Sequence, residues 1–233
     1  MAGNDVTPKL VVPAYFHPAV DPAGWTALAE AADQVRLVVL NVASGPGTQY
    51  DSAFAPVVAR LRAAGVPVAG YVDSAYGTRP VADALVDFSR HRDWFSVDAV
   101  FFDRVSTGAD QVGHYAELAE AARLLGAGEV VFNHGAHPIK PYADHAELLG
   151  TFEGPWSTYV ELSTPRWPRA LPAERFLHLV YDVPDAQTEE ALDLIARRNA
   201  GTSLVSDHSG ANPWGRLPSW FPLPANGKGT LIA

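Results

Sequence analysis

Carboxylates follow five of the eight apolar, β-type segments of this chain, at the point where each segment ends. Asp103 and Glu153 differ from the others because each directly follows a strongly apolar run, residues 100–102 and residues 151–152. A carboxylate that projects from so apolar a strand is partly desolvated, which raises its pKa and suits acid–base catalysis. The remaining three are Asp73, Asp182 and Asp207. For Asp182 and Asp207, capping of the following helix or loop is the favoured interpretation.

Aromatic rings, amides and further polar groups occupy the same segment ends. The apolar faces of pyranose rings pack on Trp and Tyr, while their hydroxyls bond to acids and amides, and such pockets hold a few polar groups among apolar walls. The pattern indicates a carbohydrate ligand, with Asp103 and Glu153 as the catalytic pair; packing in the core is the alternative for the rings. The candidate substrate-binding residues are Tyr15, His17, Asn41, Asp73, Tyr76, Arg104, Asn133, His134, Trp156, Asp207 and Trp214.

The elements that must position these residues alternate between short apolar runs and longer amphipathic runs. We expect strands at 10–16, 36–41, 68–72, 97–102, 130–132, 148–152, 176–181 and 203–205, and helices at 24–33, 50–64, 81–92, 110–125, 141–147 and 188–199. A proline-rich stretch, 157–171, replaces one helix. Eight strand-then-helix units in this length predict a single (β/α)8 barrel of the TIM type over residues 1–233, in which strand ends line the site. An open doubly wound sheet is the alternative.

The composition disfavours several classes of protein. The 233 residues carry a net charge of -9, and lysine and arginine are scattered rather than clustered. We therefore expect neither nucleic acid nor an anionic membrane as a partner, and a neutral or cationic small molecule or polymer fits better. There is no cysteine, hence no disulfide and no thiolate metal site. His134 and His137 lie three residues apart without a third ligand, so no metal or other cofactor is expected.

The beginning of the sequence bears on location. The first ten residues lack the basic start and the apolar run of a secretory signal, and no run of about 18 apolar residues occurs anywhere. We expect a cytoplasmic location for the sequence as written, and secretion if a leader has been trimmed from it.

A set of short motifs, in order along nearly the whole chain, resembles the spherulation-specific family 4 (spherulin-4-like) proteins. Each motif is weak alone, whereas the ordered set is specific. The matching segments are residues 12–16, 41–47, 70–72, 76–79, 101–103, 133–135, 152–154 and 212–214. The resemblance implies a (β/α)8 barrel and kinship with glycoside hydrolases that act on galactosamine-containing polysaccharides.

The resemblance also implies roles for particular residues. In characterised relatives, an adjacent Asp–Glu pair after the fourth strand and a Glu after the sixth are implicated in catalysis. Asp103 matches the first of these and Glu153 the last, whereas Arg104 stands at the middle position. Glycoside hydrolysis needs two carboxyl groups, so we expect Glu153 as acid/base and Asp103 as nucleophile or stabiliser.

Arg104 opens alternatives to hydrolysis. A cation beside a carboxylate lowers the pKa of that carboxylate, which makes it a poorer general acid and a better nucleophile. The same cation could instead bind an anionic group of the substrate. Arg104 thus makes a non-catalytic carbohydrate-binding protein one alternative. The missing secretory signal makes another, an intracellular barrel enzyme recruited to another small-molecule reaction.

Overall fold

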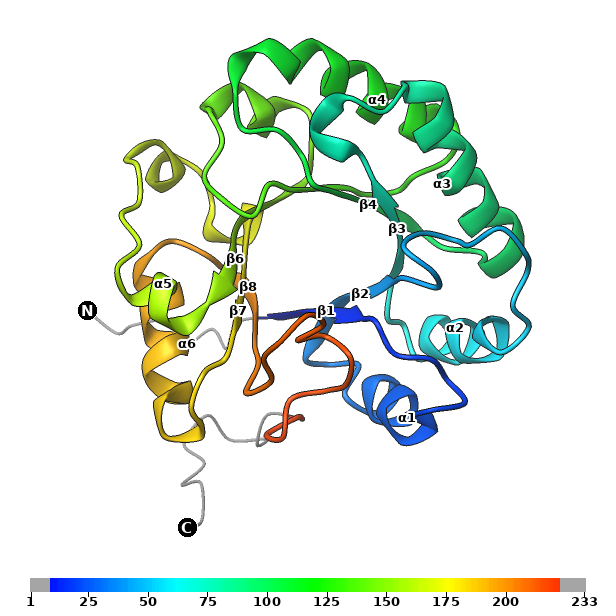
Figure 1. The fold of residues 1–233 in the computed structure, drawn as a ribbon, viewed down its shortest axis with the longest axis horizontal. Coiled ribbons are helices and arrows are strands. Elements are labelled where there is room, and N and C mark those ends of the chain that lie inside the picture. The colour runs from blue at the N-terminus through cyan, green and yellow to red at the C-terminus, as the bar shows by residue number, and fades with distance from the viewer. Residues whose placement is uncertain (1–8, 223–233) are drawn as a thin grey trace.

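Eight parallel strands close into a barrel in the computed structural model, which describes residues 9–222 (Figure 1). Each strand pairs with the next one along the chain, and β1 pairs with β8 to complete the ring. The expected TIM-type barrel is thus confirmed. The strands are β1 (Lys9–Ala14), β2 (Val35–Leu40), β3 (Val68–Asp73), β4 (Ala99–Asp103), β5 (Val130–Asn133), β6 (Leu148–Pro155), β7 (Phe176–Tyr181) and β8 (Thr202–Val205).

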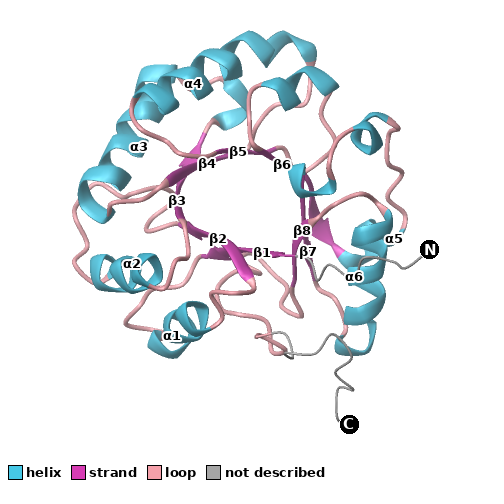
Figure 2. Ribbon diagram, turned by 180° about the vertical axis from the view of Figure 1, so that it is seen from behind, coloured by secondary structure: helices cyan, strands magenta, loops and turns pink. Residues whose placement is uncertain are grey.

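Helices form an outer ring around the strands (Figure 2). Because this ring and the packed barrel interior cover both faces of the sheet, the strands are buried along nearly their whole length and show continuous rather than alternating hydrophobicity. No helix among residues 9–222 is long and apolar enough to cross a membrane. The α-helices are α1 (Pro22–Glu30), α2 (Phe54–Ala63), α3 (Val81–Phe95), α4 (Val112–Leu124), α5 (Trp156–Val160) and α6 (Thr188–Arg197).

The local sequence explains where several helices begin and end. Asp21 accepts a hydrogen bond from the Gly24 amide at 2.8 Å, and Pro22 occupies the first helical position, so α1 begins two residues earlier than expected. Gly65, with φ +83°, follows α2 and supplies the left-handed conformation that ends it. At Gly70 a Cβ atom would lie 2.6 Å from the His91 ring, so the missing side chain lets α3 pack closely on β3.

Three expected elements differ in the structure. No regular helix is expected in the proline-rich stretch 157–171, but the short α-helix α5 covers its beginning. The helical segment expected at 141–147 is present but is a shorter 3-10 helix, Lys140–Asp144. Its anchor is the buried side chain of Tyr142, which donates to the Gly108 carbonyl at 2.8 Å, and so short a segment gains little from helix propagation. The sixth strand is longer than expected, because pairing with β7 continues to Pro155. Glu153 therefore lies within β6 rather than after it.

Candidate active site

At the carboxyl end of the barrel, two carboxylates from different strands accept hydrogen bonds from the same asparagine side chain. Asp103 ends β4, Asn133 ends β5 and Glu153 lies near the end of β6. Asn133 Nδ2 donates to Asp103 Oδ1 at 2.7 Å and to Glu153 Oε2 at 2.5 Å. These two bond lengths limit the separation of the two carboxylate oxygens to at most about 5.2 Å, their sum. The two acids that the sequence singled out therefore lie close together and share one hydrogen-bond donor.

The outer oxygen of each carboxylate has its own donor. The Tyr71 hydroxyl donates to Asp103 Oδ2 at 2.8 Å, and Trp214 Nε1 donates to Glu153 Oε1 at 2.9 Å. All four carboxylate oxygens thus accept a hydrogen bond from a partly or fully buried side chain. This arrangement holds both carboxylates in fixed orientations while each oxygen keeps a further lone pair for a ligand.

Burial and hydrogen bonding act in opposite directions on the two acids. Burial raises the pKa of Asp103, and donation from Tyr71, from the Arg104 backbone and from Asn133 lowers it in part. Burial also raises the pKa of Glu153, and the negative charge of Asp103 raises it further, against donation from Trp214 and Asn133. The pKa values of both acids lie above their ordinary values on balance. This confirms the expectation of desolvated carboxyl groups.

Two tyrosines border the acid pair on the side of β1 and β3. Burial and the nearby charges of Asp103 and Glu153 raise the pKa of Tyr15, and burial followed by the charge of Asp103 raises the pKa of Tyr71. Both hydroxyls therefore stay protonated as donors. The two rings meet edge to face with centroids 5.6 Å apart.

Glycines in β6 and the β5 loop make room for this arrangement. A Cβ atom at Gly150 would lie 2.3 Å from Asn133 Oδ1, so the asparagine fits only because that residue has no side chain. Gly135 has φ +65°, and its carbonyl accepts from the Glu153 amide at 3.0 Å. The two chain segments are thereby fastened together directly beside the acid pair.

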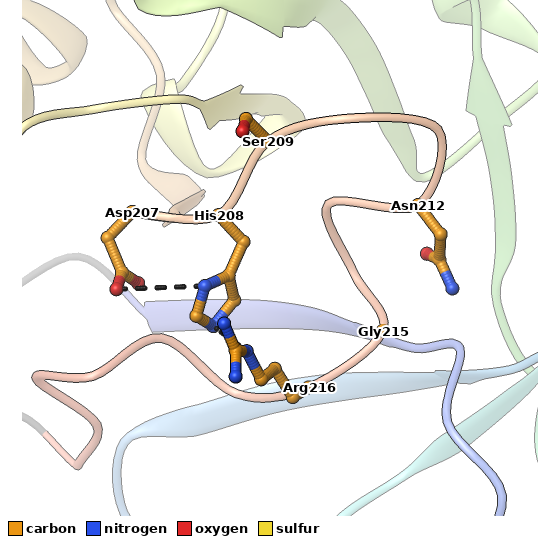
Figure 3. A pocket seen from close by; sticks show the side chains of 6 residues that line it. All are labelled: Asp207, His208, Ser209, Asn212, Gly215 and Arg216. Atoms are coloured by element: carbon orange, nitrogen blue, oxygen red, sulfur yellow. Dashed lines mark hydrogen bonds and ion pairs between the residues drawn. The ribbon is translucent and has the colours of Figure 1, made fainter.

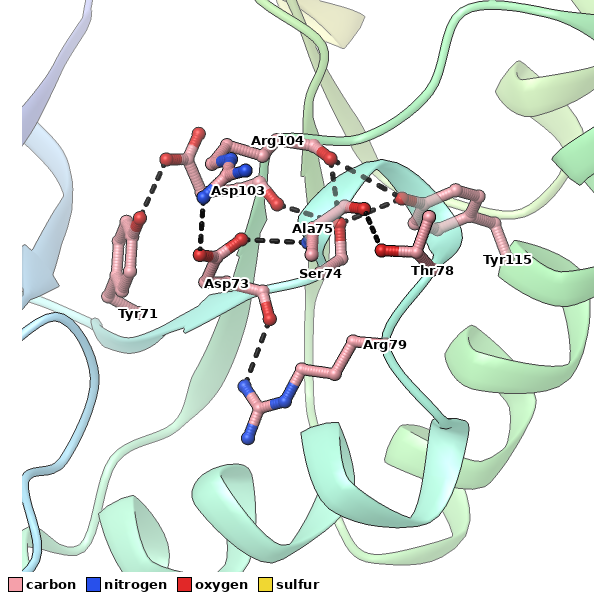
Figure 4. A network of polar contacts seen from close by, with 9 residues as sticks. All are labelled: Tyr71, Asp73, Ser74, Ala75, Thr78, Arg79, Asp103, Arg104 and Tyr115. Atoms are coloured by element: carbon pink, nitrogen blue, oxygen red, sulfur yellow. Dashed lines mark hydrogen bonds and ion pairs between the residues drawn. The ribbon is translucent and has the colours of Figure 1, made fainter.

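The loops after β3 and β4 form a second network next to Asp103 (Figure 4). Arg104 has φ +54°, and its guanidinium donates to Asp73 at 2.9 Å and lies 5.0 Å from the centre of the Tyr76 ring. The Ser74 hydroxyl donates within this network, lying 2.7 Å from the Asp103 carbonyl oxygen. Tyr76 also has a positive φ, +56°, and 55% of its surface is exposed. An aromatic ring is therefore held at the rim by a strained and heavily bonded loop.

The family model described as spherulation-specific family 4 matches residues 9–222. The chain belongs to this family. Spherulin-4 of Physarum polycephalum is 29% identical over 150 residues, which are 62% of this chain and 44% of that protein. The chain thus matches less than half the length of this curated relative.

Solved structures agree on the barrel. Sph3 of Aspergillus clavatus, in complex with GalNAc, superposes with a TM-score of 0.79 at 22% identity and covers 93% of this chain and 95% of that one. Deoxyribose phosphate aldolase of Aeropyrum pernix superposes with a TM-score of 0.55 at 14% identity, over 87% of both chains. The spore cortex-lytic enzyme SleL of Bacillus cereus gives 0.51 at 8% identity, over 86% of this chain and 60% of that one. At these identities the similarity shows the fold alone.

For a member of spherulation-specific family 4, Arg104 is the residue that departs from the expected Asp–Glu pair. Its guanidinium turns away from Asp103 and pairs with Asp73, which lies opposite Asp103 in the register of β3 and β4. Its backbone N–H, rather than its positive charge, lowers the pKa of Asp103. The guanidinium expected to act on Asp103 is thus paired with Asp73, and the backbone of Arg104 bonds to Asp103 instead.

The structure separates four other candidate residues from the acid pair. His17 Nε2 lies 3.0 Å from Asp51 Oδ2, and Asn41 Oδ1 accepts from the Gly45 amide at 2.9 Å. His134 and Trp156 are almost fully buried. His134 Nδ1 lies 2.8 Å from the Ser106 carbonyl oxygen, and Trp156 Nε1 donates to Gln187 at 2.8 Å. Within the described part of the chain, none of these four side chains is hydrogen-bonded to Asp103 or Glu153, and substrate binding by them stays a prediction.

Two further expectations concern Asp207 and metal binding. Asp207 Oδ1 accepts from the Ser219 amide at 3.1 Å, which agrees with the expected loop cap. Among residues 9–222, no group of three or more His, Asp or Glu side chains is arranged to hold a metal ion. Burial lowers the pKa values of His134 and His137 to about 4, which keeps both rings neutral at physiological pH.

Tyr71 is the site residue that the sequence reasoning missed. It lies inside β3, two residues before Asp73, so alternation along the strand sends both side chains to the same face. That spacing was the available signal. Because only residues at strand ends were considered as candidates, Tyr71, which lies inside the strand, was not among them.

Proposed function

We propose that this protein is a glycoside hydrolase that cleaves galactosamine-containing or related saccharides with Asp103 and Glu153. The observation that carries the proposal is the shared amide of Asn133, which joins two desolvated carboxylates. Hydrolysis of a glycosidic bond needs two carboxyl groups on opposite sides of that bond. Two acids at the carboxyl end of barrel strands, with aromatic rings beside them, supply this requirement.

The surroundings of the two acids assign their roles. Both burial and the charge of Asp103 raise the pKa of Glu153, which favours a protonated general acid. Asp103 accepts from Tyr71, Asn133 and the Arg104 backbone, three donors that favour its anionic form and suit a nucleophile. The two oxygens that share Asn133 lie at most about 5.2 Å apart, which is closer than the roughly 6.5–9.5 Å typical of inverting enzymes and therefore supports a retaining mechanism.

The reaction then proceeds in two balanced steps. Asp103 attacks the anomeric carbon and forms a covalent glycosyl ester, while Glu153 gives its proton to the glycosidic oxygen, which leaves as an alcohol. Glu153, now a carboxylate, takes a proton from water, and the resulting oxygen nucleophile displaces Asp103 and releases the sugar. Tyr71 and Trp214 keep the two carboxylates oriented through both steps.

Three observations support a galactosamine-type substrate. The chain belongs to the spherulation-specific family, and its structural neighbour Sph3 was solved in complex with GalNAc. Tyr15, Tyr71 and Trp214 place aromatic rings around the acid pair. The net charge of -9 favours a neutral or partly deacetylated, cationic saccharide over an anionic one.

Replacement of Glu153 by Gln tests the assignment. Glu153→Gln keeps the size of the side chain but cannot donate or accept the catalytic proton, so the rate on oligomers of N-acetylgalactosamine should fall by several orders of magnitude. The matched control is Glu190→Gln, an exposed position on α6, which should retain full activity. If Glu153→Gln hydrolyses these oligomers at the parent rate, the assignment is wrong.

Arg104 supports a second candidate, a protein that binds carbohydrate without cleaving it. This residue stands where the family resemblance implies a catalytic Glu, and its guanidinium is committed to Asp73. Binding alone would give saturable heat on titration with the oligomers and no new reducing ends. Calorimetry beside an end-group assay therefore separates the two candidates.

A further inference from the structure

A separate polar pocket lies on the loop that follows β8. It is a hollow of about 370 Å³ at the same end of the barrel as the acid pair. Asp207, His208, Ser209, Asn212, Gly215 and Arg216 line it (Figure 3). The loop therefore has room for a ligand group of its own.

The pocket and the acid pair share one wall, made by residues 212–215. Trp214 donates from its ring to Glu153, and its backbone carbonyl accepts from the Tyr15 amide at 3.2 Å. Asn212 donates to the Tyr15 carbonyl at 3.1 Å and accepts from the Trp214 amide at 3.2 Å. Gly215, the next residue, lines the pocket. The segment 212–215 therefore connects the acid pair to the pocket, with Trp214 bonded to Glu153 and its neighbour Gly215 in the pocket wall.

Opposite charges stand in the pocket without direct contact. The His208 ring lies between them, with Nδ1 3.7 Å from Asp207 Oδ2 and Nε2 3.1 Å from Arg216 Nε. No ion pair joins Asp207 to Arg216 within the described residues. The terminal Nη atoms of the exposed Arg216 have no hydrogen-bond partner among residues 9–222. Among the described residues, the pocket therefore presents the unpaired Nη donors of Arg216 and, on the other side of the His208 ring, the carboxylate of Asp207 as an acceptor.

This arrangement selects for an uncharged ligand that both donates and accepts. An anion would meet Asp207 and a cation would meet Arg216, at a cost in either case. A sugar hydroxyl is donor and acceptor at once, so neighbouring hydroxyls of one ring can satisfy the carboxylate and the guanidinium together. Hydrogen bonds to charged groups are the stronger kind, so such contacts would add substantially to affinity.

We propose that this pocket binds an uncharged sugar unit of the substrate chain, at least one unit away from the bond that is cleaved. The inference rests on the proposed function for the identity of the chain. In this proposal Arg216 determines specificity in two ways. It favours longer saccharides over shorter ones, and it favours an N-acetylated sugar over a free amino sugar in this pocket.

Length-dependent kinetics test the proposal. The parent, Arg216→Ala and the control Arg169→Ala are compared on a hexamer of N-acetylgalactosamine and on an aryl glycoside that carries one such sugar. Arg169 is exposed on the 3-10 turn Trp167–Ala170, remote in sequence from the β8 loop. Arg216→Ala should lose about tenfold to a hundredfold in kcat/KM on the hexamer and much less on the aryl glycoside, while Arg169→Ala matches the parent. An equal loss on both substrates, or no loss on the hexamer, overturns the inference.

A binding measurement separates this proposal from the proposed function. Titration of the ¹⁵N-labelled full chain with the hexamer should shift the resonances of Ser209, Gly215 and Arg216, and Arg216→Ala should weaken binding about tenfold or more. Such shifts without hydrolysis by the parent overturn the proposed function and leave the pocket assigned. Hydrolysis without these shifts overturns the pocket alone. Equal or tighter binding of a deacetylated hexamer overturns the preference for an uncharged unit.

Discussion

Removal of the Asn133 amide is the most direct perturbation of the acid pair. Asn133→Ala deletes both hydrogen bonds from Nδ2 to the acids, 2.7 Å to Asp103 and 2.5 Å to Glu153, and also the 3.3 Å bond that Oδ1 accepts from the Gly135 amide. A hydrogen bond to a charged group contributes roughly 1.5–3 kcal/mol, and one pKa unit corresponds to about 1.4 kcal/mol. Each bond stabilises the anionic form, so its loss should raise the pKa of both acids by about one unit, with about two as the limit when no water replaces the amide.

Carboxyl-detected NMR titration measures these pKa values without any need for a substrate. The matched control is Asn199→Ala, since Asn199 Nδ2 also donates to two acceptors, the carbonyls of Pro168 and Leu171 at 2.9 and 3.2 Å. This control should lower stability and leave the titrations of Asp103 and Glu153 unchanged. With a cleaved saccharide, both limbs of the pH–rate profile should move to higher pH in Asn133→Ala. Unchanged or lowered pKa values of both acids in that variant would refute the shared-amide account.

Three further perturbations have defined outcomes. Tyr71→Phe removes the hydroxyl that donates to Asp103, so the pKa of Asp103 should rise in the same NMR titration. The value of kcat at neutral pH should fall about tenfold. An unchanged pKa of Asp103 would contradict the hydrogen bond. Burial raises the folded-state pKa of Glu153, so the stability linked to its neutral form is complete below its ordinary pKa of 4.5 and is lost as pH rises through the folded value. Glu153→Gln should therefore gain stability relative to the parent as the pH rises above 4.5 in urea denaturation, and a difference that stays constant with pH would count against the shift. Gly70→Ala brings a Cβ to within 2.6 Å of His91 and should lower the free energy of unfolding by about 1–3 kcal/mol. The control is Gly113→Ala on α4, where an added Cβ has no neighbouring atom within 4 Å, and it should be neutral or stabilising in the same denaturation assay.

Sequence reasoning located the acid pair because its evidence is local. The apolar run 100–102 before Asp103 and the run 151–152 before Glu153 show where strands approach their carboxyl ends. In a parallel barrel all such ends meet on one face, so strand assignment alone brings the two acids to that face. The burial and the partners of His134 and Trp156 could not be predicted in this way, because position at a strand end does not reveal whether a side chain is exposed at the barrel mouth or packed beneath it.

By itself, the sequence determined the barrel, through eight apolar segments with amphipathic connections, and the two carboxylates at its rim. The tertiary structure decided which partners those carboxylates have. Trp214 reaches Glu153 across 61 residues of chain, and Arg104, from the loop after β4, pairs with Asp73 at the end of β3. Hydrophobic periodicity depends on neighbours a few residues apart, whereas hydrogen-bond partners at the barrel mouth depend on the closed arrangement of all eight strands and their loops.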